Sequence, residues 1–195
     1  MTRFIPTFLL FSIISASAPI TKGERERAMS ELHASRKMVI DAAAGLSEAQ
    51  LNWKAGADRW SIAEVVEHLA VTEPFLFGFY KQVAAGPAVA AAKAELGDEA
   101  FLKSIRSRDK KAKAPEQITP KKAFANTADA LAAFKVRRDE TIAYVETTEV
   151  QDLRQKIVPN SKMDAYQMIL MLAAHAERHC EQIAEVKASA GYPKR

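Results

Sequence analysis

The feature that most restricts the fold is a long amphipathic segment near the C-terminus, Ser161 to Ala190. Its apolar side chains recur at the spacing of one helix face: Met168, Leu172, Ile183 and Val186. His175 and His179 continue that stripe, because side chains four residues apart on a helix lie one turn above each other. Since an apolar helix face must pack against other elements, both imidazoles are expected to face the interior.

Capping-box patterns, in which a Ser or Thr precedes a Glu or Gln by three residues, predict where other helices begin. Thr21-Lys-Gly-Glu24 opens a first long helix, which we expect to stop at Gly45. Ser47-Glu-Ala-Gln50 opens a single turn, and Ser61-Ile-Ala-Glu64 opens a second long helix. The inward stripe of this second helix is predicted to be Val65, His68, Leu69, Thr72, Phe75 (or Leu76) and Phe79.

Proline marks two further expected boundaries. Pro74 removes a backbone donor inside the second helix, so a kink or an early end is expected there. Thr119-Pro120 is expected to begin a third long helix. Its predicted stripe is Phe124, Leu131, Phe134, Arg138 and residues 142–145. Residues 86–120 between these helices form a long connection, with one short helix predicted near Asp98 to Ser107.

The last long helix follows a crossover loop at residues 151–160 and is predicted to start from Ser161-Lys-Met-Asp164. No strand-like alternation with hairpin turns occurs between the helical segments. The chain has only 7 Gly and 8 Pro, which also favours helix. We therefore predict an all-α four-helix bundle with one long connection between its second and third helices.

The charge pattern argues against a nucleic-acid partner. A net charge of +4 is spread over both signs, without basic residues and aromatic residues interleaved on one face. The densest basic run, Lys103 to Lys113, is expected to be a solvated loop or helix face, and its role is open.

The N-terminus is predicted to be an export signal. Met1-Thr-Arg3 is positive, Phe4 to Ile14 is almost wholly apolar, and small residues follow up to Ala18. The apolar run is shorter than the roughly 20 residues that span a bilayer. Residues 1–18 are therefore expected to be cleaved, which leaves no membrane span, a periplasmic or secreted product and a bundle domain at residues 22–191. Translation from Met29 would instead leave the protein in the cytoplasm.

Two histidines one turn apart are, on their own, weak evidence for a metal site. A third inward-facing histidine, His68, strengthens that evidence. All three inward-facing histidines then come from helices of one bundle, where unpaired buried imidazoles would be costly. Three neutral imidazoles can hold one divalent ion and leave a coordination position open for water or substrate. We therefore predict His68, His175 and His179 as ligands of a divalent transition metal. Ligand type suits zinc, nickel, iron or copper, and zinc, nickel or iron are expected.

Other residues near the predicted metal site are interpreted in structural terms. Glu177 lies about 200° round the helix from His175, so it cannot act as the base of a zinc protease. Glu64 could orient His68 or could simply cap Ser61. His33 is interpreted as a rim residue and Cys180, the single cysteine, as a small buried apolar residue. Trp60 is expected to plug one end of the bundle, and Tyr166 is expected in the core. Arg138 and Arg178 could place positive charge near the cavity, but surface positions are expected for both.

Several short motifs resemble the DinB/YfiT-like family of helical-bundle metalloenzymes. They are Trp60-Ser-Ile62 followed by His68-Leu69, His175-xxx-His179, and Gly45 to Trp53 before them. The resemblance covers about residues 24–191, with Pro74 and the export signal as departures. It implies an up-down-down-up four-helix bundle with a metal held by His68, His175 and His179. The family includes S-transferases and isomerases that use low-molecular-weight thiols, and many members of unassigned activity.

The leading hypothesis is therefore a divalent-metal-dependent enzyme that activates water or a small thiol, in the manner of a hydrolase or an S-transferase. Its partner would be a small-molecule substrate. The alternatives are a non-catalytic metal-binding or stress-related bundle, and an interaction module whose histidines are ordinary core residues. An apolar face of the bundle could also pair two copies into a homodimer.

Overall fold

The computed structural model describes residues 18–89, 92–110 and 113–194, and the predicted export signal lies outside these ranges except for Ala18. The helices are α1 (Lys22–Ala43), α2 (Glu48–Asn52), α3 (Ile62–Ala85), α4 (Asp98–Arg106), α5 (Thr127–Thr147) and α6 (Ala165–Ala188), with 3-10 turns η1 (Glu116–Ile118) and η2 (Leu153–Gln155). Over the described part of the chain no β-strand forms, only two isolated bridges. The all-α prediction is confirmed.

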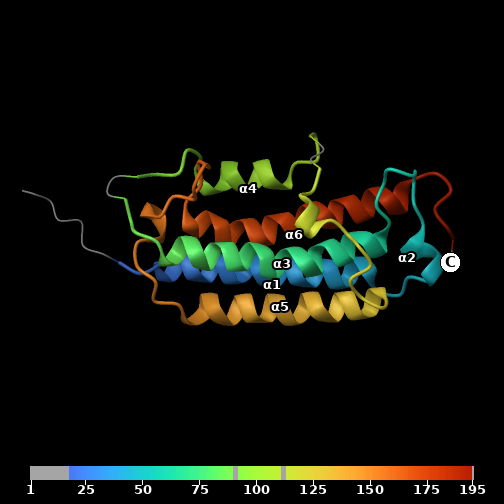
Figure 1. The fold of residues 1–195 in the computed structure, drawn as a ribbon, viewed down its shortest axis with the longest axis horizontal. Helices are drawn as coiled ribbons and strands as arrows, with labels where there is room; N and C mark the ends of the chain where they lie inside the picture. The colour runs from blue at the N-terminus through green and yellow to red at the C-terminus, as the bar shows by residue number, and fades with distance from the viewer. Residues whose placement is uncertain (1–17, 90–91, 111–112, 195) are drawn as a thin grey trace, which may run out of the picture.

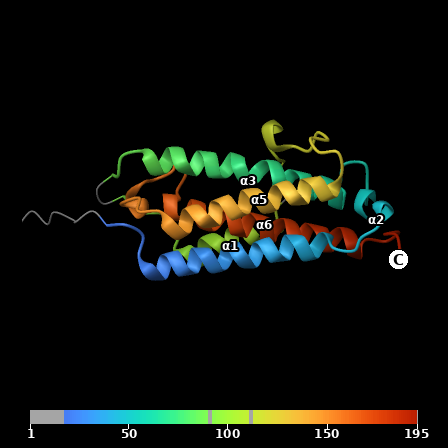
Figure 2. The same cartoon turned by 90° about the horizontal axis from the view of Figure 1, so that it is seen from below.

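Four long helices, α1, α3, α5 and α6, lie side by side as a bundle (Figures 1 and 2). The colours of Figure 1 show α1 and α6 running in one direction and α3 and α5 in the other, an up-down-down-up order. The connection from α3 to α5 returns along the whole bundle and carries α4, which packs on α6. This is the predicted long connection. No helix in the described ranges combines the length and hydropathy that a bilayer span requires.

All three capping boxes predicted for the first half of the chain are present. Thr21, Ser47 and Ser61 each accept a hydrogen bond from the backbone N–H three residues on, and the Glu or Gln at that position bonds back to the cap. Gly45, just after α1, has φ of 66°, the left-handed conformation that glycine adopts without strain. The local signals therefore position these helix starts correctly.

The start of α5 differs from the prediction. The helix begins at Thr127 with Asn126 as its cap, and Thr119-Pro120 lies in a loop seven residues earlier. Two backbone amides of this loop, at Lys121 and Ala123, donate to the carboxylate of Glu67 on α3 at 2.7 and 3.0 Å. Because these amides donate to a carboxylate of another helix, the segment lies against α3 instead of starting a helix.

Two other boundaries also differ. The cap of α6 is Asp164, which accepts from the Gln167 N–H at 2.7 Å, so the helix starts later than the Ser161 pattern predicts. Helix α3 continues through Pro74 to Ala85, so the early end expected at the proline is wrong. Beyond Pro74, Tyr80, Val83 and Ala84 are buried, and Leu76, the predicted alternative to Phe75, packs partly against the core. Phe75 and Phe79 are 47% and 38% exposed.

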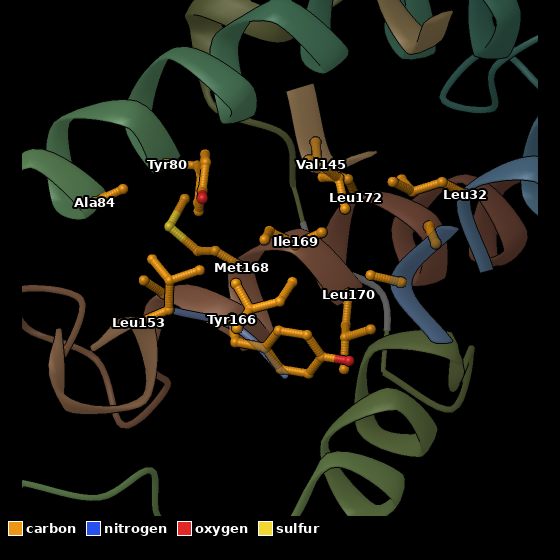
Figure 3. Packing of buried hydrophobic residues seen from close by; sticks show 14 of the residues in the cluster. Leu32, Tyr80, Ala84, Val145, Leu153, Tyr166, Met168, Ile169, Leu170 and Leu172 are labelled. Carbon is orange, nitrogen blue, oxygen red and sulfur yellow. The ribbon is translucent and has the colours of Figure 1, made fainter. Parts of the chain in front are cut away.

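The core has two apolar clusters with a polar layer between them. One cluster joins the start of α6 to the ends of α3 and α5, and Figure 3 shows Tyr80 and Val145 packing around Met168 and Ile169. The other surrounds the second half of α6 and the first half of α3.

Arg138 lies on the predicted stripe of its helix but was expected at the surface because of its charge; it is fully buried in the polar layer. Its guanidinium donates to both carboxylate oxygens of Glu73 at 2.6 and 2.8 Å. It also bonds Ser35 Oγ on α1 at 2.6 Å and the Leu172 carbonyl on α6 at 2.9 Å. One side chain of α5 therefore contacts all three other bundle helices, which explains why it can be buried with its charge.

Candidate metal centre

Three imidazoles converge where the first half of α3 packs against the middle of α6. Nε2 of His175 lies 3.4 Å from Nε2 of His68 and 3.2 Å from Nε2 of His179. One ligand atom from each ring lies within 4.8 Å of the others. The rings come from one side of α3 and one turn of α6, two helices that pack against each other. The spatial cluster expected for His68, His175 and His179 is therefore present.

The spacing of these nitrogens suits a divalent ion. Imidazole nitrogens bind zinc at about 2.0–2.1 Å, so two ligands of a tetrahedral site lie roughly 3.3 Å apart. The separations of Nε2 of His175 from Nε2 of His68 and of His179, 3.4 and 3.2 Å, bracket that value. Three histidines fill three positions of a tetrahedron, and a fourth position would remain for water or substrate.

Two of the rings are oriented by hydrogen bonds at their other nitrogen. Nδ1 of His68 donates to the Ile118 carbonyl of η1 at 2.7 Å, and Nδ1 of His179 donates to Oε1 of Gln182 at 2.9 Å. Each bond requires the proton on Nδ1, so the Nε2 lone pair is directed at the common centre. Thr72 Oγ1 also lies 3.2 Å from Nδ1 of His68.

The Ile118 carbonyl depends on the loop that follows it. Glu67, adjacent to His68 on α3, binds the Lys121 and Ala123 amides and so fixes this loop against the helix. Lys122 between them has φ of 60°, a conformation that turns the backbone so that both amides reach one carboxylate oxygen. The partner of His68 thus comes from a segment 50 residues away in the sequence.

The surroundings of the triad keep the imidazoles neutral. Burial lowers the pKa of His68 and, together with the other two rings, holds the pKa of His179 well below its ordinary value. Burial, the neighbouring His68 ring and then the positive charges of Arg138 and Arg178 lower the pKa of His175 to about 3. Neutral imidazole is the form that binds metal, so the site favours the ligand state.

The triad opens onto a cavity of about 710 Å³. Its walls are Asp58, Arg59, Trp60, His68, Arg108, Lys113, Ala114, Pro115, Ile118, Thr119, His175, Arg178, His179 and Gln182. The Trp60 ring lies 4.9 Å from the His68 ring and nearly parallel to the His179 ring at 6.3 Å. Trp60 is therefore a wall of this cavity as well as a part of the adjoining apolar cluster. A cavity of this size can enclose a small organic molecule.

Several neighbouring residues behave as predicted. Glu177 bonds Arg106 and does not join the triad. Tyr166 is buried and donates to the Glu24 carbonyl at 2.9 Å. Cys180 is buried, which raises the pKa of its thiol to about 12. His33 lies on the exposed side of α1.

Two interpretations of Glu64 were open, and the cap of Ser61 is the correct one. Glu64 also pairs with Lys54 at 2.8 Å, and the hydrogen-bond partners of the His68 ring are other residues. The partners that orient the rings, Ile118 and Gln182, were missed. The position of Gln182 three residues after His179 could have been found from helical spacing. The Ile118 carbonyl could not, because no local pattern brings it to α3.

Known proteins with similar sequences and structures agree with this fold. A family model described as the DinB superfamily matches residues 31–183. The uncharacterized protein YuaE of Bacillus subtilis (strain 168) is 27% identical over 146 residues, which cover 73% of this chain and 86% of YuaE. A solved structure of YfiT from Bacillus subtilis superimposes with a TM-score of 0.59 at 16% identity, over 89% of this chain and 91% of YfiT. That protein is described as a probable metal-dependent hydrolase with an unusual four-helix bundle topology.

Proposed function

This chain belongs to the DinB superfamily, and on that premise we propose that it is a divalent-metal-dependent enzyme whose ion is held by His68, His175 and His179. The observation that carries the proposal is the convergence of three Nε2 atoms, 3.2 and 3.4 Å apart, on one cavity. The description of YfiT as a probable metal-dependent hydrolase supports the same class of chemistry.

A bound divalent ion would lower the pKa of a water or thiol at its open position and so provide a nucleophile near neutral pH. The residues of the chain prepare that position. The Ile118 carbonyl and Gln182 hold two imidazoles in the ligand tautomer. Trp60 and Ile118 form apolar walls that limit water around the reacting group.

The cavity favours catalysis over a closed structural site. A structural zinc site is surrounded by four protein ligands, whereas the described residues bring only three metal-ligating side chains together here. The fourth direction faces a space large enough for a substrate. Hydrolysis and thiol transfer both fit such a site, since each needs one activated nucleophile beside a bound substrate.

The first test is the metal content of the purified chain and of its His175→Ala/His179→Ala variant. We expect about one transition metal per chain in the parent protein and almost none in the variant, because two of three ligands are gone. His33→Ala is the matched control, since His33 is exposed on α1 and should leave the metal content unchanged. An equal metal content in all three proteins would contradict the proposed site.

The second test addresses catalysis. The metal-loaded protein would be assayed with chromogenic esters and with electrophiles that accept a thiol. Turnover that disappears in His68→Ala, with helical content retained, is expected. Bound metal without an exchangeable water, together with no turnover, would favour a non-catalytic metal-binding bundle instead.

A further inference from the structure

The cavity beside the triad is lined by an excess of positive charge. Arg59, Arg108, Lys113 and Arg178 line it, and Asp58 is the one acidic residue among its described walls. A substrate that enters this space therefore approaches four cations and a bound divalent ion. Such a field attracts anions and repels cations.

Two of the four cations are already paired. Arg108 makes a double hydrogen bond to the Glu185 carboxylate at 2.9 and 2.8 Å, and Arg59 lies 3.6 Å from the same group. Glu185 is therefore shared between them. This one carboxylate balances one of the two positive charges, and the three groups together keep a net charge of +1.

Arg178 and Lys113 are the two cations left over. Arg178 donates to the backbone carbonyls of Ile105 and Lys110, at 3.5 and 2.7 Å. These neutral partners hold the guanidinium in place without cancelling its charge, and Glu185, the carboxylate whose charge also acts on it, is already shared by the other two arginines of the cavity wall. Lys113 is exposed and has no acidic partner in the described part of the chain.

Arg178 also lies close to the triad. It is three residues after His175 and one before His179, so its side chain leaves α6 beside the metal-facing stripe. Arg178, His175 and His179 line the same cavity. A group bound by Arg178 would thus be within one small molecule's length of the metal.

The same cavity has an apolar wall. Trp60, Pro115 and Ile118 face it, and the indole lies next to two of the three imidazoles. Aromatic and apolar surfaces bind carbon skeletons, whereas guanidinium and ammonium groups bind carboxylates or phosphates. The two kinds of wall occur together beside one reactive position.

We propose that the substrate is a small organic oxyanion, a carboxylate or a phosphate ester, whose negative group binds Arg178 and Lys113. Its carbon skeleton packs on Trp60, and its reacting atom reaches the open position of the metal. This inference rests on the proposed function, because it assigns the substrate class of that same site. Carboxylate and phosphate share the oxyanion chemistry that a guanidinium recognises, and the test below separates them.

The test is calorimetric binding of three aromatic probes: phenylacetate, phenyl phosphate and the neutral 2-phenylethanol. Each is titrated into the metal-loaded chain and into chelator-treated chain, because an anion can also bind the metal directly. We expect at least one anion to bind about tenfold tighter than the neutral probe in both forms, the effect of a charge-assisted hydrogen bond. The stronger of the two anions then identifies the substrate group.

Two variants test whether Lys113 and Arg178 cause the preference for anions. Lys113→Gln and Arg178→Gln should each reduce anion affinity about fivefold to tenfold and leave the neutral probe unchanged. Arg178→Lys should restore part of the loss, since charge is retained without the planar fork. Lys135→Gln, an exposed lysine on α5, and Arg137→Gln are the matched controls with the same charge changes outside the cavity.

The outcomes separate this inference from the metal site. Equal affinities for anions and the neutral probe, or an anion preference that survives Arg178→Gln and Lys113→Gln together, would overturn the oxyanion assignment while metal binding stands. A preference that disappears on chelation would also overturn it. Failure of the chain to retain metal would instead count against the proposed enzyme, and the chelator-treated titrations would still decide the oxyanion question.

Discussion

Each imidazole of the triad sits in a different local environment. His68 is bonded by a backbone carbonyl from a distant loop, and His179 by a side chain one turn along its own helix. His175, half-buried between them, faces the cavity. Because a hydrogen bond at Nδ1 fixes both the tautomer and the ring angle, these partners decide how well the three lone pairs meet.

Gln182→Ala should weaken metal binding without unfolding the protein. Loss of the bond to Nδ1 leaves the His179 ring free to rotate, and the loss of such a partner typically costs about 10–100-fold in metal affinity. A competition titration with a metal-binding dye would measure the change. Gln82→Ala, at an exposed position of α3, provides the control. Equal affinity in both variants would show that Gln182 does not orient the ring.

At the scale of helices, local signals predicted some boundaries and missed others. The Thr21, Ser47 and Ser61 boxes are correct because every group in a capping box lies within four residues. The expected start of α5 at Thr119 is wrong because Glu67, on another helix, binds the amides of that loop. A helix start is predictable where its hydrogen bonds are local.

The first turns of three helices meet at Arg154, a residue of η2. Its guanidinium bonds Glu24 in the first turn of α1 at 2.7 Å, Asp98 in the first turn of α4 at 2.8 Å, and the α6 cap Asp164 at 3.3 Å. The guanidinium also stacks on Tyr166, 4.0 Å from the ring centre. One cation thus joins three acidic helix N-termini, each of which the helix dipole favours as negative.

The three carboxyl groups that Arg154 contacts change the stability of the fold with pH in opposite directions. The bonds from Arg154 lower the pKa of Asp98 below its ordinary 3.8. Burial opposes a lowering at Glu24, but bonds from the Thr21 backbone and Arg154 outweigh it. A lowered carboxyl pKa stabilises the fold above the ordinary value and loses that contribution as the pH falls. Asp164, whose pKa is raised by burial, acts in the opposite direction.

Arg154→Met should therefore reduce stability most at neutral pH. We expect a loss of about 1–2 kcal/mol at pH 7, a value reduced for the partial exposure of Arg154. The difference from the parent protein should shrink as the pH falls from the ordinary carboxyl range through the lowered pKa values that Asp98 and Glu24 have in the folded parent. Urea unfolding at several pH values would measure it.

The matched control is Arg137→Met, which breaks an exposed pair with Glu140. Solvent screens that pair, so its effect should be below about 0.5 kcal/mol at every pH. A constant difference between the Arg154 variant and the parent from pH 7 to pH 3 would contradict the electrostatic explanation.

For the whole molecule, the layer around Arg138 determines how the four long helices fit together. Its bonds reach Glu73, Ser35 and Leu172, one on each of the other bundle helices. A buried charge leaves little freedom in helix register, because every donor must meet its acceptor. The layer also lies close enough to the triad for the Arg138 charge to lower the pKa of His175.

Removal of one member of this pair should be far more costly than removal of both. Arg138→Met or Glu73→Leu leaves an unpaired buried charge, and each is expected to lower the free energy of unfolding by about 3–5 kcal/mol. The double variant replaces the pair with apolar side chains and should recover most of that loss. Thermal and urea unfolding of the four proteins would form the double-mutant cycle. Additive losses would show that the two charges do not stabilise each other.

Much of the architecture was predictable from residue patterns alone. The all-α bundle follows from 3.6-residue periodicity and local caps, and the long connection follows from the weak helix signals between residues 86 and 120. The clustering of His68, His175 and His179 was predictable because each lies on the inward stripe of its helix. Their role as metal ligands stays a prediction for the metal analysis to decide.

Packing between distant segments determined the features that residue patterns did not predict. Arg138 is buried although its charge favours the surface, since Glu73 and backbone carbonyls from other helices satisfy it. The Ile118 carbonyl reaches His68 only because Glu67 holds the loop. Helical periodicity and caps are short-range properties that neighbouring residues encode. The partner of a buried charge or ring nitrogen is a long-range property, which exists only once the helices have packed.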